Sequence, residues 1–188
     1  MNISELLPTL EFCAELTQSE CAILASLGSL ESFPPKSIVF RTGEPAVASY
    51  LVVEGHVSLE ICAAGVGCRR ILSVGRGELI GWSPFLSDAC FTATARTLEP
   101  TQLIRIDADR LRQACEQNHE FGYQILRKLV KTLSTRINAA RLQMLDVFGT
   151  ESVPSFSACD SRCEASTEKT SSETPTITKT EGVNKNGG

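Results

Sequence analysis

The hydrophobic and polar positions of this 188-residue chain follow four successive patterns. Residues 1–30 have helical spacing, residues 30–106 consist of short apolar runs separated by turn residues, and residues 107–148 return to helical spacing. Residues 149–188 are rich in Ser, Thr, Glu and Lys and contain few large apolar side chains. We therefore expect one domain over 1–148 and, because a polar segment cannot bury enough surface to offset its ordering entropy, a disordered Ser/Thr-rich tail over 149–188.

Capping residues mark the ends of the predicted helices. Thr17 and Glu20 form a Thr-x-x-Glu capping box, and Gly28 suits the C-terminal cap of the helix that follows. Asp107 is a good N-cap for a helix that ends near Asn118. Helical segments are therefore expected on both sides of the strand-rich segment.

The middle segment predicts strands joined by tight turns. Residues 57–63 alternate between apolar and polar side chains and are expected to pair with residues 69–74 across a glycine-containing loop. A second hairpin is expected between residues 91–98 and 102–106, with Glu99-Pro100-Thr101 between them. Many short strands at this spacing are typical of a small barrel or roll.

A long C-terminal helix is predicted to carry an apolar seam, because its apolar residues recur at steps of three and four. Such a stripe packs either against a second copy of the helix or back onto the roll, and we favour the homodimer. Four cations lie off the seam and are expected to form a solvated face: Lys128, Lys131, Arg136 and Arg141. The seam itself consists of Gly122, Leu126, Leu129, Leu133, Ile137, Ala140, Met144 and Val147.

Composition narrows the classes of function. The formal net charge is −4, so the chain has no bulk attraction for nucleic acid, although a local basic patch remains compatible with it. No apolar stretch approaches the roughly 20 residues of a membrane span, and the N-terminus lacks the pattern of a signal peptide, so a cytoplasmic location is expected. Neither His56 nor His119 belongs to a catalytic motif, and we expect no enzymatic activity.

The eight cysteines include no CxxC pair. The closest spacings are Cys62 to Cys68 and Cys159 to Cys163. In a reducing compartment free thiols behave as small buried hydrophobes, and zinc or iron–sulfur sites usually show tighter pairs. We therefore expect unconnected thiols and no metal site.

Three stretches of the middle segment resemble the cyclic nucleotide-binding domain of the catabolite activator and fumarate–nitrate regulator family. They are residues 40–44 (FRTGE), 50–57 (YLVVEGHV) and 75–81 (GRGELIG), and with the helical ends the resemblance covers residues 10–148. It implies an α+β, mainly β fold: a double-stranded β-helix jelly roll flanked by N-terminal helices and a long C-terminal helix. Gly43 and Gly55 occupy turns that need positive φ or close chain approach.

The resemblance implies a phosphate-binding cassette that opens at Gly77, where backbone N–H groups receive an anion and Glu78 accepts from a ribose hydroxyl. Relatives that bind nucleotides end the cassette with an Arg that pairs with the phosphate, and here Phe91 stands at that position. Losing the Arg that pairs with the phosphate costs about 2–5 kcal/mol of binding free energy, so tight binding of cyclic AMP is not expected. A cyclic nucleotide is nevertheless the only cofactor that the resemblance implies. Trp82 either contacts a ligand or plugs the cavity. The predicted ligand site comprises Gly77, Glu78, Leu79, Ile80, Gly81, Trp82, Ser83, Phe91 and Thr92, with Arg69 or Arg70 as the replacement cation.

The resemblance also implies a mechanism, because in relatives a ligand in the roll changes how the long helices pack. We expect a non-catalytic sensory domain that binds a small ligand and signals through a protein partner that the sequence does not identify. Two alternatives stay open: a regulator of the same family that acts without its own DNA-binding domain, and a ligand-free structural dimerisation module. The tail offers no basic recognition helix, so direct DNA binding is not expected, and neither is membrane insertion.

Overall fold

The structure is a computed structural model that describes residues 2–63, 65, 67–85 and 90–148, without the side chains of Ala63 and residues 143–148. The described residues up to Val147 belong to one compact unit. The predicted tail at 149–188, with Cys159 and Cys163, lies outside the described residues.

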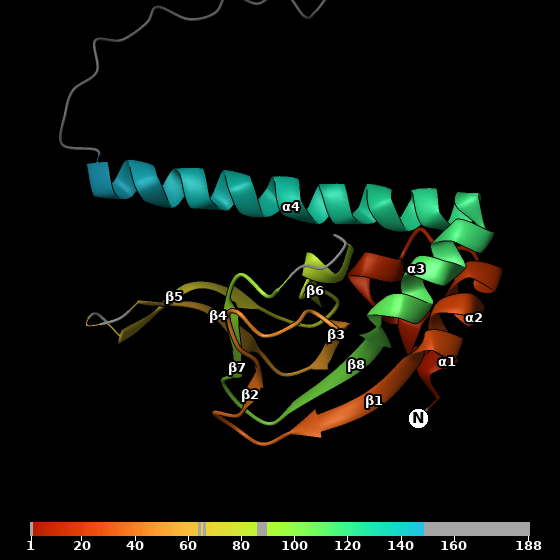
Figure 1. The fold of residues 1–188 in the computed structure, drawn as a ribbon, viewed down its shortest axis with the longest axis horizontal. Coiled ribbons are helices and arrows are strands. Elements are labelled where there is room, and N and C mark those ends of the chain that lie inside the picture. Colours follow the sequence, from red (N-terminus) through yellow and green to blue (C-terminus); the bar gives the residue numbers. More distant parts are fainter. Residues whose placement is uncertain (1, 64, 66, 86–89, 149–188) are drawn as a thin grey trace, which may run out of the picture. The chain divides into compact units, whose positions relative to one another are not determined.

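Within the described residues, eight strands form two antiparallel four-stranded sheets, which confirms the jelly-roll prediction (Figure 1). The strand order is β1-β8-β3-β6 in one sheet and β2-β7-β4-β5 in the other. The strands are β1 (Gly28–Phe33), β2 (Ile38–Phe40), β3 (Ala48–Glu54), β4 (Val57–Ala63), β5 (Gly67–Val74), β6 (Leu79–Ile80), β7 (Thr94–Thr97) and β8 (Thr101–Asp107).

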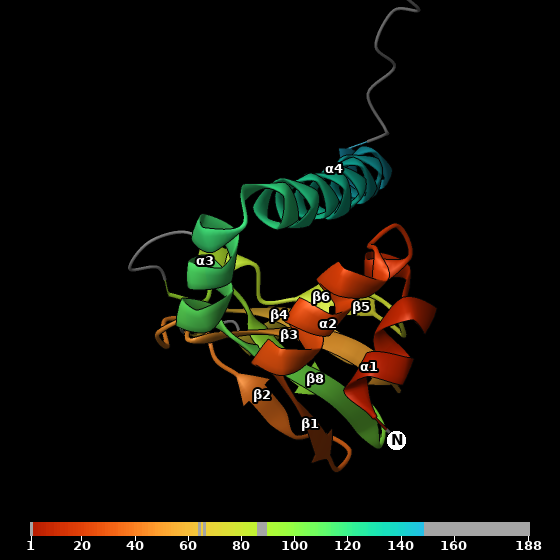
Figure 2. The ribbon, with the colours of Figure 1, turned by 90° about the vertical axis from the view of Figure 1, so that its right-hand side faces the viewer.

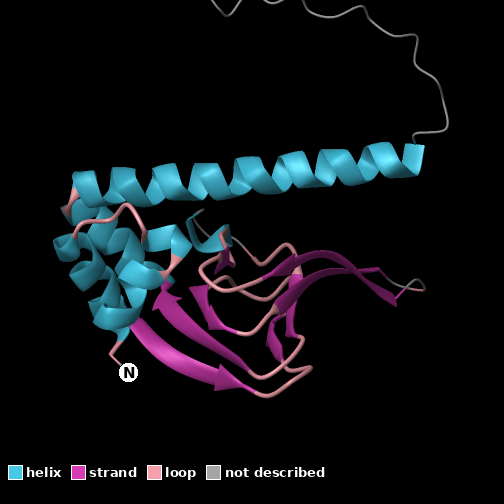
Figure 3. Cartoon of the chain, turned by 180° about the vertical axis from the view of Figure 1, so that it is seen from behind, coloured by secondary structure: helices cyan, strands magenta, loops and turns pink. Residues whose placement is uncertain are grey.

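The helices gather at one end of the roll, and the long helix α4 runs from there alongside it (Figures 1 and 3). The capping predictions are confirmed: Thr17 and Glu20 close a capping box at α2, and the Asp107 side chain accepts from the Arg110 N–H at α3. The helices are α1 (Ile3–Leu6), α2 (Gln18–Leu27), α3 (Ala108–Gln117) and α4 (His119–Phe148), with short 3-10 turns η1 (Leu7–Thr9), η2 (Glu11–Cys13) and η3 (Ser83–Phe85).

The β4–β5 hairpin is confirmed, but the second predicted hairpin is wrong. β7 pairs with β2 and β4, whereas β8 pairs with β1 and β3 in the other sheet. The intervening chain crosses between the sheets and packs on the turn between β3 and β4, where the Leu98 N–H donates to the His56 carbonyl at 2.9 Å. Gly55 in that turn has φ +84°, and a Cβ there would lie 2.6 Å from the Pro100 carbonyl oxygen. Only glycine suits this crossing.

The buried side chains form two clusters. One lies inside the roll and contains Phe40, Tyr50 and Phe91, with the Phe40 and Phe91 rings stacked at a centroid distance of 3.8 Å. The other joins the helices to the sheet β1-β8-β3-β6, and α4 enters it through Phe121, Ile125 and Leu129. The end-on view of Figure 2 shows α4 on the helical side of the molecule, above α1 and α2. The second cluster therefore holds the first half of α4 against its own domain.

Cys62 and Cys68 face each other across the β4–β5 hairpin and form a disulfide. The expectation of unconnected thiols is therefore wrong for this pair, because strand register rather than sequence spacing brings the two sulfur atoms together. Cys13 and Cys21 are free and buried, as expected for thiols that act as small hydrophobes.

Candidate functional site

The cassette turn is bound tightly to the rest of the domain through its backbone. The Gly77 N–H donates to the Val52 carbonyl at 2.8 Å, and the Gly77 carbonyl accepts from the Phe12 N–H at 2.9 Å. Gly77 has φ +87°, and a Cβ there would lie 2.8 Å from the backbone nitrogen of Glu11. The Gly77 N–H that was expected to receive an anion is thus already engaged. A ligand here cannot use the Gly77 N–H.

A cavity of about 100 Å³ lies between this turn and α4. Glu11 and Phe12 line it from the N-terminal segment, and Gly77 and Glu78 line it from the cassette. The Glu78 carboxylate also accepts from the Gly75 N–H at 2.7 Å, which fixes the side chain within its own turn. Helix α4 contributes Lys128, Lys131, Thr132, Thr135 and Arg136.

Two of the α4 cations that were predicted to be solvated are not. Lys128 is only 6% exposed, and its ammonium group contacts a Glu15 carboxylate oxygen at 2.9 Å. Arg136 is half-buried and donates to the backbone carbonyl of Leu79. The solvated-face prediction is wrong for these two residues because they share the inward side of the helix with Ile125 and Leu129. Lys131 and Arg141 are exposed as expected.

The Arg136 guanidinium is the most perturbed group of this cavity. Its Nε is buried, and among the described residues it has no hydrogen-bond acceptor. Burial lowers the pKa of Arg136, and the nearby Glu78 carboxylate acts in the opposite direction. The sequence placed Arg136 on a solvated face and did not predict its position at this cavity, although its position on the same helix face as Leu129 was a usable signal.

The predicted ligand residues do not gather around one cavity. Ile80, Gly81, Ser83 and Phe91 are buried, and Leu79 belongs to the helix-side core. Phe91 fills the roll where the resemblance placed a phosphate-binding Arg. Arg69, Arg70 and Thr92 are exposed, and none of them lines the cavities described here, so the structure does not support Arg69 or Arg70 as a replacement cation.

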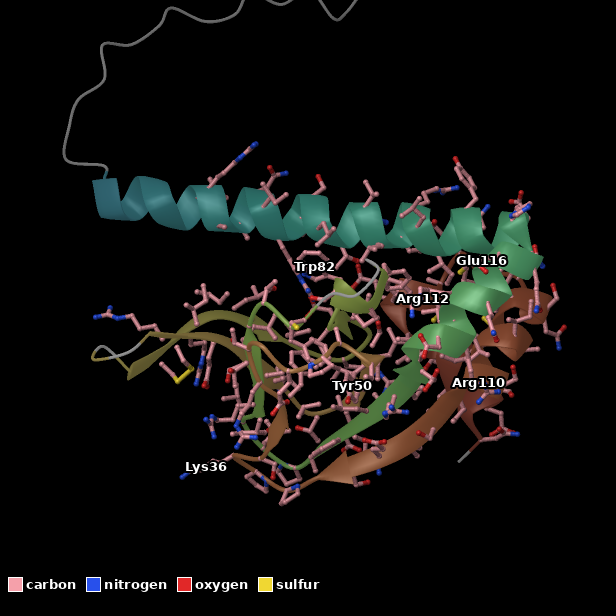
Figure 4. All side chains as sticks on the ribbon, viewed as in Figure 1. Lys36, Tyr50, Trp82, Arg110, Arg112 and Glu116 are labelled. Atoms are coloured by element: carbon pink, nitrogen blue, oxygen red, sulfur yellow. A yellow bond between two sulfur atoms is a disulfide. The ribbon has the colours of Figure 1, made fainter. Side chains whose placement is uncertain are left out.

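Trp82 lies between the roll and α4, partly buried against the helix-side core (Figure 4). It is not part of the cluster inside the roll. Its surroundings show a packing role against the helix-side core, which is neither of the two predicted roles, contact with a ligand and plugging of the cavity.

The outward side of α4 carries an apolar stripe that the described part of the chain leaves largely uncovered. Leu126, Val130 and Ile137 are each more than half exposed. Leu133 is half-buried and Ala140 exposed, so the stripe advances in steps of four and three, as in a coiled coil. The predicted seam shifts accordingly: Leu129 packs into the domain's own core and Val130 takes its place, because two adjacent apolar residues fit the periodicity equally well. The side chain of Met144 lies outside the described residues.

A larger, open groove of about 460 Å³ lies between η3, α3 and the start of α4. Its walls include Phe85, Leu111 and Ile125, with Arg112 and Glu116 at its edge on α3 (Figure 4). Leu126 of the apolar stripe also lines it, so groove and stripe form one continuous apolar surface.

Comparisons with known proteins agree with this architecture. The family model described as "Cyclic nucleotide-binding domain" matches residues 30–118. The potassium channel KAT1 of rice (Oryza sativa subsp. japonica) is 32% identical over 106 residues, which cover 56% of this chain but only 15% of the channel. A putative cyclic nucleotide-binding protein from Geobacter metallireducens has a TM-score of 0.65 and 26% identity, covering 73% of this chain and 99% of that protein. The catabolite activator protein of Thermus thermophilus has a TM-score of 0.60 and 24% identity, covering 74% and 63%, and shows the same fold.

None of the described helices is both long enough and apolar enough to cross a membrane.

Proposed function

From the match of residues 30–118 to the model of the cyclic nucleotide-binding domain family, we propose that the chain is a non-catalytic regulatory sensor that pairs through α4 and reports ligand binding to a protein partner in the cytoplasm. The proposal rests on the two sides of α4: the inward side contacts the cassette, and the outward side exposes apolar side chains. Direct DNA binding is not part of it, since a net charge of −4 provides no bulk attraction for a polyanion.

The inward side of α4 contacts the cassette. Arg136 donates to the Leu79 carbonyl, and Leu129 packs in the same cluster as the Leu79 side chain. A ligand that displaced either contact would change the free energy of placing α4 against the roll. The inward side therefore provides the input of a sensor.

The outward side of α4 provides the output. At 3.6 residues per turn, Leu126, Val130 and Ile137 lie on a face about 90° from that of Leu129 and Arg136. An exposed apolar stripe with heptad spacing is typical of a helix that pairs with its own copy. Because both faces belong to one rigid helix, ligand binding and helix pairing are coupled. Each changes the equilibrium constant of the other by the same factor.

The experiment is sedimentation equilibrium on the full 188-residue chain. Wild type is expected to be dimeric at micromolar concentration. The double variant V130E/I137E is expected to weaken the dimer at least about 100-fold, because it places two carboxylates in an apolar seam. Leu142→Glu is the matched control, since Leu142 is 64% exposed on the same helix but points away from the stripe.

A monomeric wild type, or equal weakening by both sets of variants, would contradict the proposed pairing. A dimer whose stability responds to no ligand would favour the ligand-free structural module, an alternative supported by the aromatic packing of Phe40 and Phe91 inside the roll.

A further inference from the structure

Three side chains with metal-binding atoms meet near the end of the β4–β5 hairpin. Cys62 and Cys68 are opposite each other in the strand register, and Glu60 lies two residues before Cys62, so all three belong to the same face of the hairpin. One ligand atom of each, two sulfur atoms and a carboxylate oxygen, lies within 4.8 Å of the others. The disulfide between the two cysteines marks this place in Figure 4.

The Glu60 carboxylate is held in position by two partners on its own sheet. The Ser58 hydroxyl donates to one carboxylate oxygen at 2.8 Å, and the Arg96 Nε–H donates to the other at 3.3 Å. Ser58 is fully buried, and the Glu60 side chain is only 12% exposed. Each carboxylate oxygen has two lone pairs, so one remains on each oxygen for a metal ion. Hydrogen bonds of this kind orient metal-ligating carboxylates in known metal sites.

The chemistry of these three ligands selects the kind of ion. Thiolate sulfur favours zinc and similar soft ions, whereas Mg²⁺ and Ca²⁺ prefer oxygen ligands. Two thiolates and one carboxylate carry three negative charges, which a divalent ion and the neighbouring Arg96 guanidinium balance. Three protein ligands leave the fourth position of a tetrahedral ion to water.

We propose that the reduced β4–β5 hairpin binds one thiophilic divalent cation, such as Zn²⁺, through Cys62, Cys68 and Glu60. The sequence predicted no metal site because these cysteines are not closely spaced in the chain, whereas strand pairing brings them together. This inference goes beyond the proposed sensor function and does not depend on it.

Metal binding and the disulfide exclude each other, because both use the sulfur atoms of Cys62 and Cys68. A dithiol reductant opens the disulfide in two exchange steps. Its first thiolate attacks one cysteine sulfur and displaces the other, and its second thiolate displaces the remaining cysteine and closes the reductant's own disulfide. Two electrons and two protons thus pass to the cysteine pair, and the two protons leave for solvent when the metal binds. The hairpin therefore holds a metal when reduced and a disulfide when oxidised.

The test is metal titration of the full 188-residue chain, reduced with dithiothreitol and freed of it by anaerobic gel filtration. Competition with a chromogenic chelator is expected to give a Zn²⁺ dissociation constant below about 1 µM. Co²⁺ is the spectroscopic probe, and it should show a thiolate-to-cobalt charge-transfer band. Excess Mg²⁺ should displace neither ion. The chain with its disulfide intact is expected to bind Zn²⁺ at least about 100-fold more weakly.

Two variants and a matched control assign the ligands. C62S/C68S should lose the cobalt band and bind Zn²⁺ at least about 100-fold more weakly than reduced wild type, which also lacks the disulfide. Glu60→Gln is expected to weaken Zn²⁺ binding about 10- to 100-fold and to keep the band. Glu31→Gln is the control, since Glu31 also lies on a strand and pairs with an arginine, Arg105, at 3.9 Å. It should leave the affinity unchanged.

The cysteines of the predicted tail, Cys159 and Cys163, provide a second control. C159S/C163S is expected to retain both the ion and the cobalt band. Loss of the band in C159S/C163S but not in C62S/C68S would assign the ion to the tail pair and overturn the hairpin site. Equal Zn²⁺ affinity of the reduced and disulfide forms, equal weakening by Glu60→Gln and Glu31→Gln, or no Zn²⁺ binding tighter than about 100 µM would also overturn it.

Discussion

The aromatic rings of Phe40 and Phe91 stack inside the roll, with an interplanar angle of 13°. Phe91 begins the strand segment at which nucleotide-binding relatives are expected to present a phosphate-binding Arg. The stacked pair therefore fills with carbon the place where a buried phosphate would require a positive charge.

Cyclic AMP is expected to bind no more tightly than about 1 mM, because Phe91 stands in place of this cation in the described part of the roll. The cavity at Glu78, at about 100 Å³, is also below the roughly 300–1,000 Å³ of sites for ligands of this size. Calorimetric titration, with Trp82 fluorescence followed in parallel, measures this affinity. Cyclic GMP serves as the second probe. Micromolar binding of either nucleotide would show that the roll opens and that another cation meets the phosphate.

Substitution of Phe91 by Ala is expected to lower the free energy of unfolding by about 3–5 kcal/mol, because it removes a 4% exposed ring from the cluster inside the roll. Urea denaturation measures the loss. The neighbouring exposed Thr92→Ala is the control and should change stability by less than about 0.5 kcal/mol. Comparable losses in the two variants would mean that Phe91 is not part of a packed core.

The disulfide between Cys62 and Cys68 is expected to stabilise the hairpin. It closes a short loop, with a sequence separation of 6, so its loss in the C62S/C68S variant should cost about 2 kcal/mol in urea denaturation. Peptide mapping without reductant should recover the two cysteines as one linked species. Recovery of both cysteines as alkylated thiols from protein purified in air would show that the disulfide does not form. In a reducing compartment the disulfide is expected to be reduced.

Cys13 is expected to resist alkylation. Burial, followed by the charge of Cys21, raises the pKa of the Cys13 thiol to about 12. Iodoacetamide at pH 8 should therefore modify exposed Cys90 well before Cys13, as read by mass spectrometry of the separate peptides. Simultaneous modification would indicate that η2 opens readily.

The same shift predicts how stability depends on pH. The unfolded thiol releases its proton near pH 9 and the native thiol near pH 12, so the unfolded chain binds fewer protons in between. The contribution of Cys13 is fully present below pH 9 and decreases as the pH rises toward 12. Urea unfolding of wild type and Cys13→Ala should therefore converge with rising pH in this range. A constant difference would show that the thiol titrates normally in the folded protein.

The sequence predictions that the structure confirms depend on residues close together in the chain. The capping box of Thr17 and Glu20, the N-cap Asp107 and the β4–β5 hairpin each depend on residues close together in the chain. Gly43 and Gly55 indicated turns that the structure confirms, with φ of +85° and +84°. The jelly roll followed from the order of such signals.

The features that the sequence did not predict depend on long-range partners. The alternation of apolar and polar side chains is the same whether two consecutive strands lie in one sheet or in two. The sequence therefore predicted a hairpin of β7 and β8. Lys128 and Arg136 looked solvated because the groups that bury them, Glu15 and the Leu79 carbonyl, are distant in sequence. Without those partners, a cation on an amphipathic helix is indistinguishable from a surface residue.

The pairing of β1 has a consequence for the order of folding. β1 lies at the edge of its sheet and hydrogen-bonds only to β8 among the described strands, with Gly28 opposite Ile106. Contacts between such distant segments require a large loop to close first and slow folding. During synthesis β1 therefore stays unpaired until β8, near the end of the roll, has left the ribosome. A nascent chain that stops before residue 107 exposes that edge to other chains.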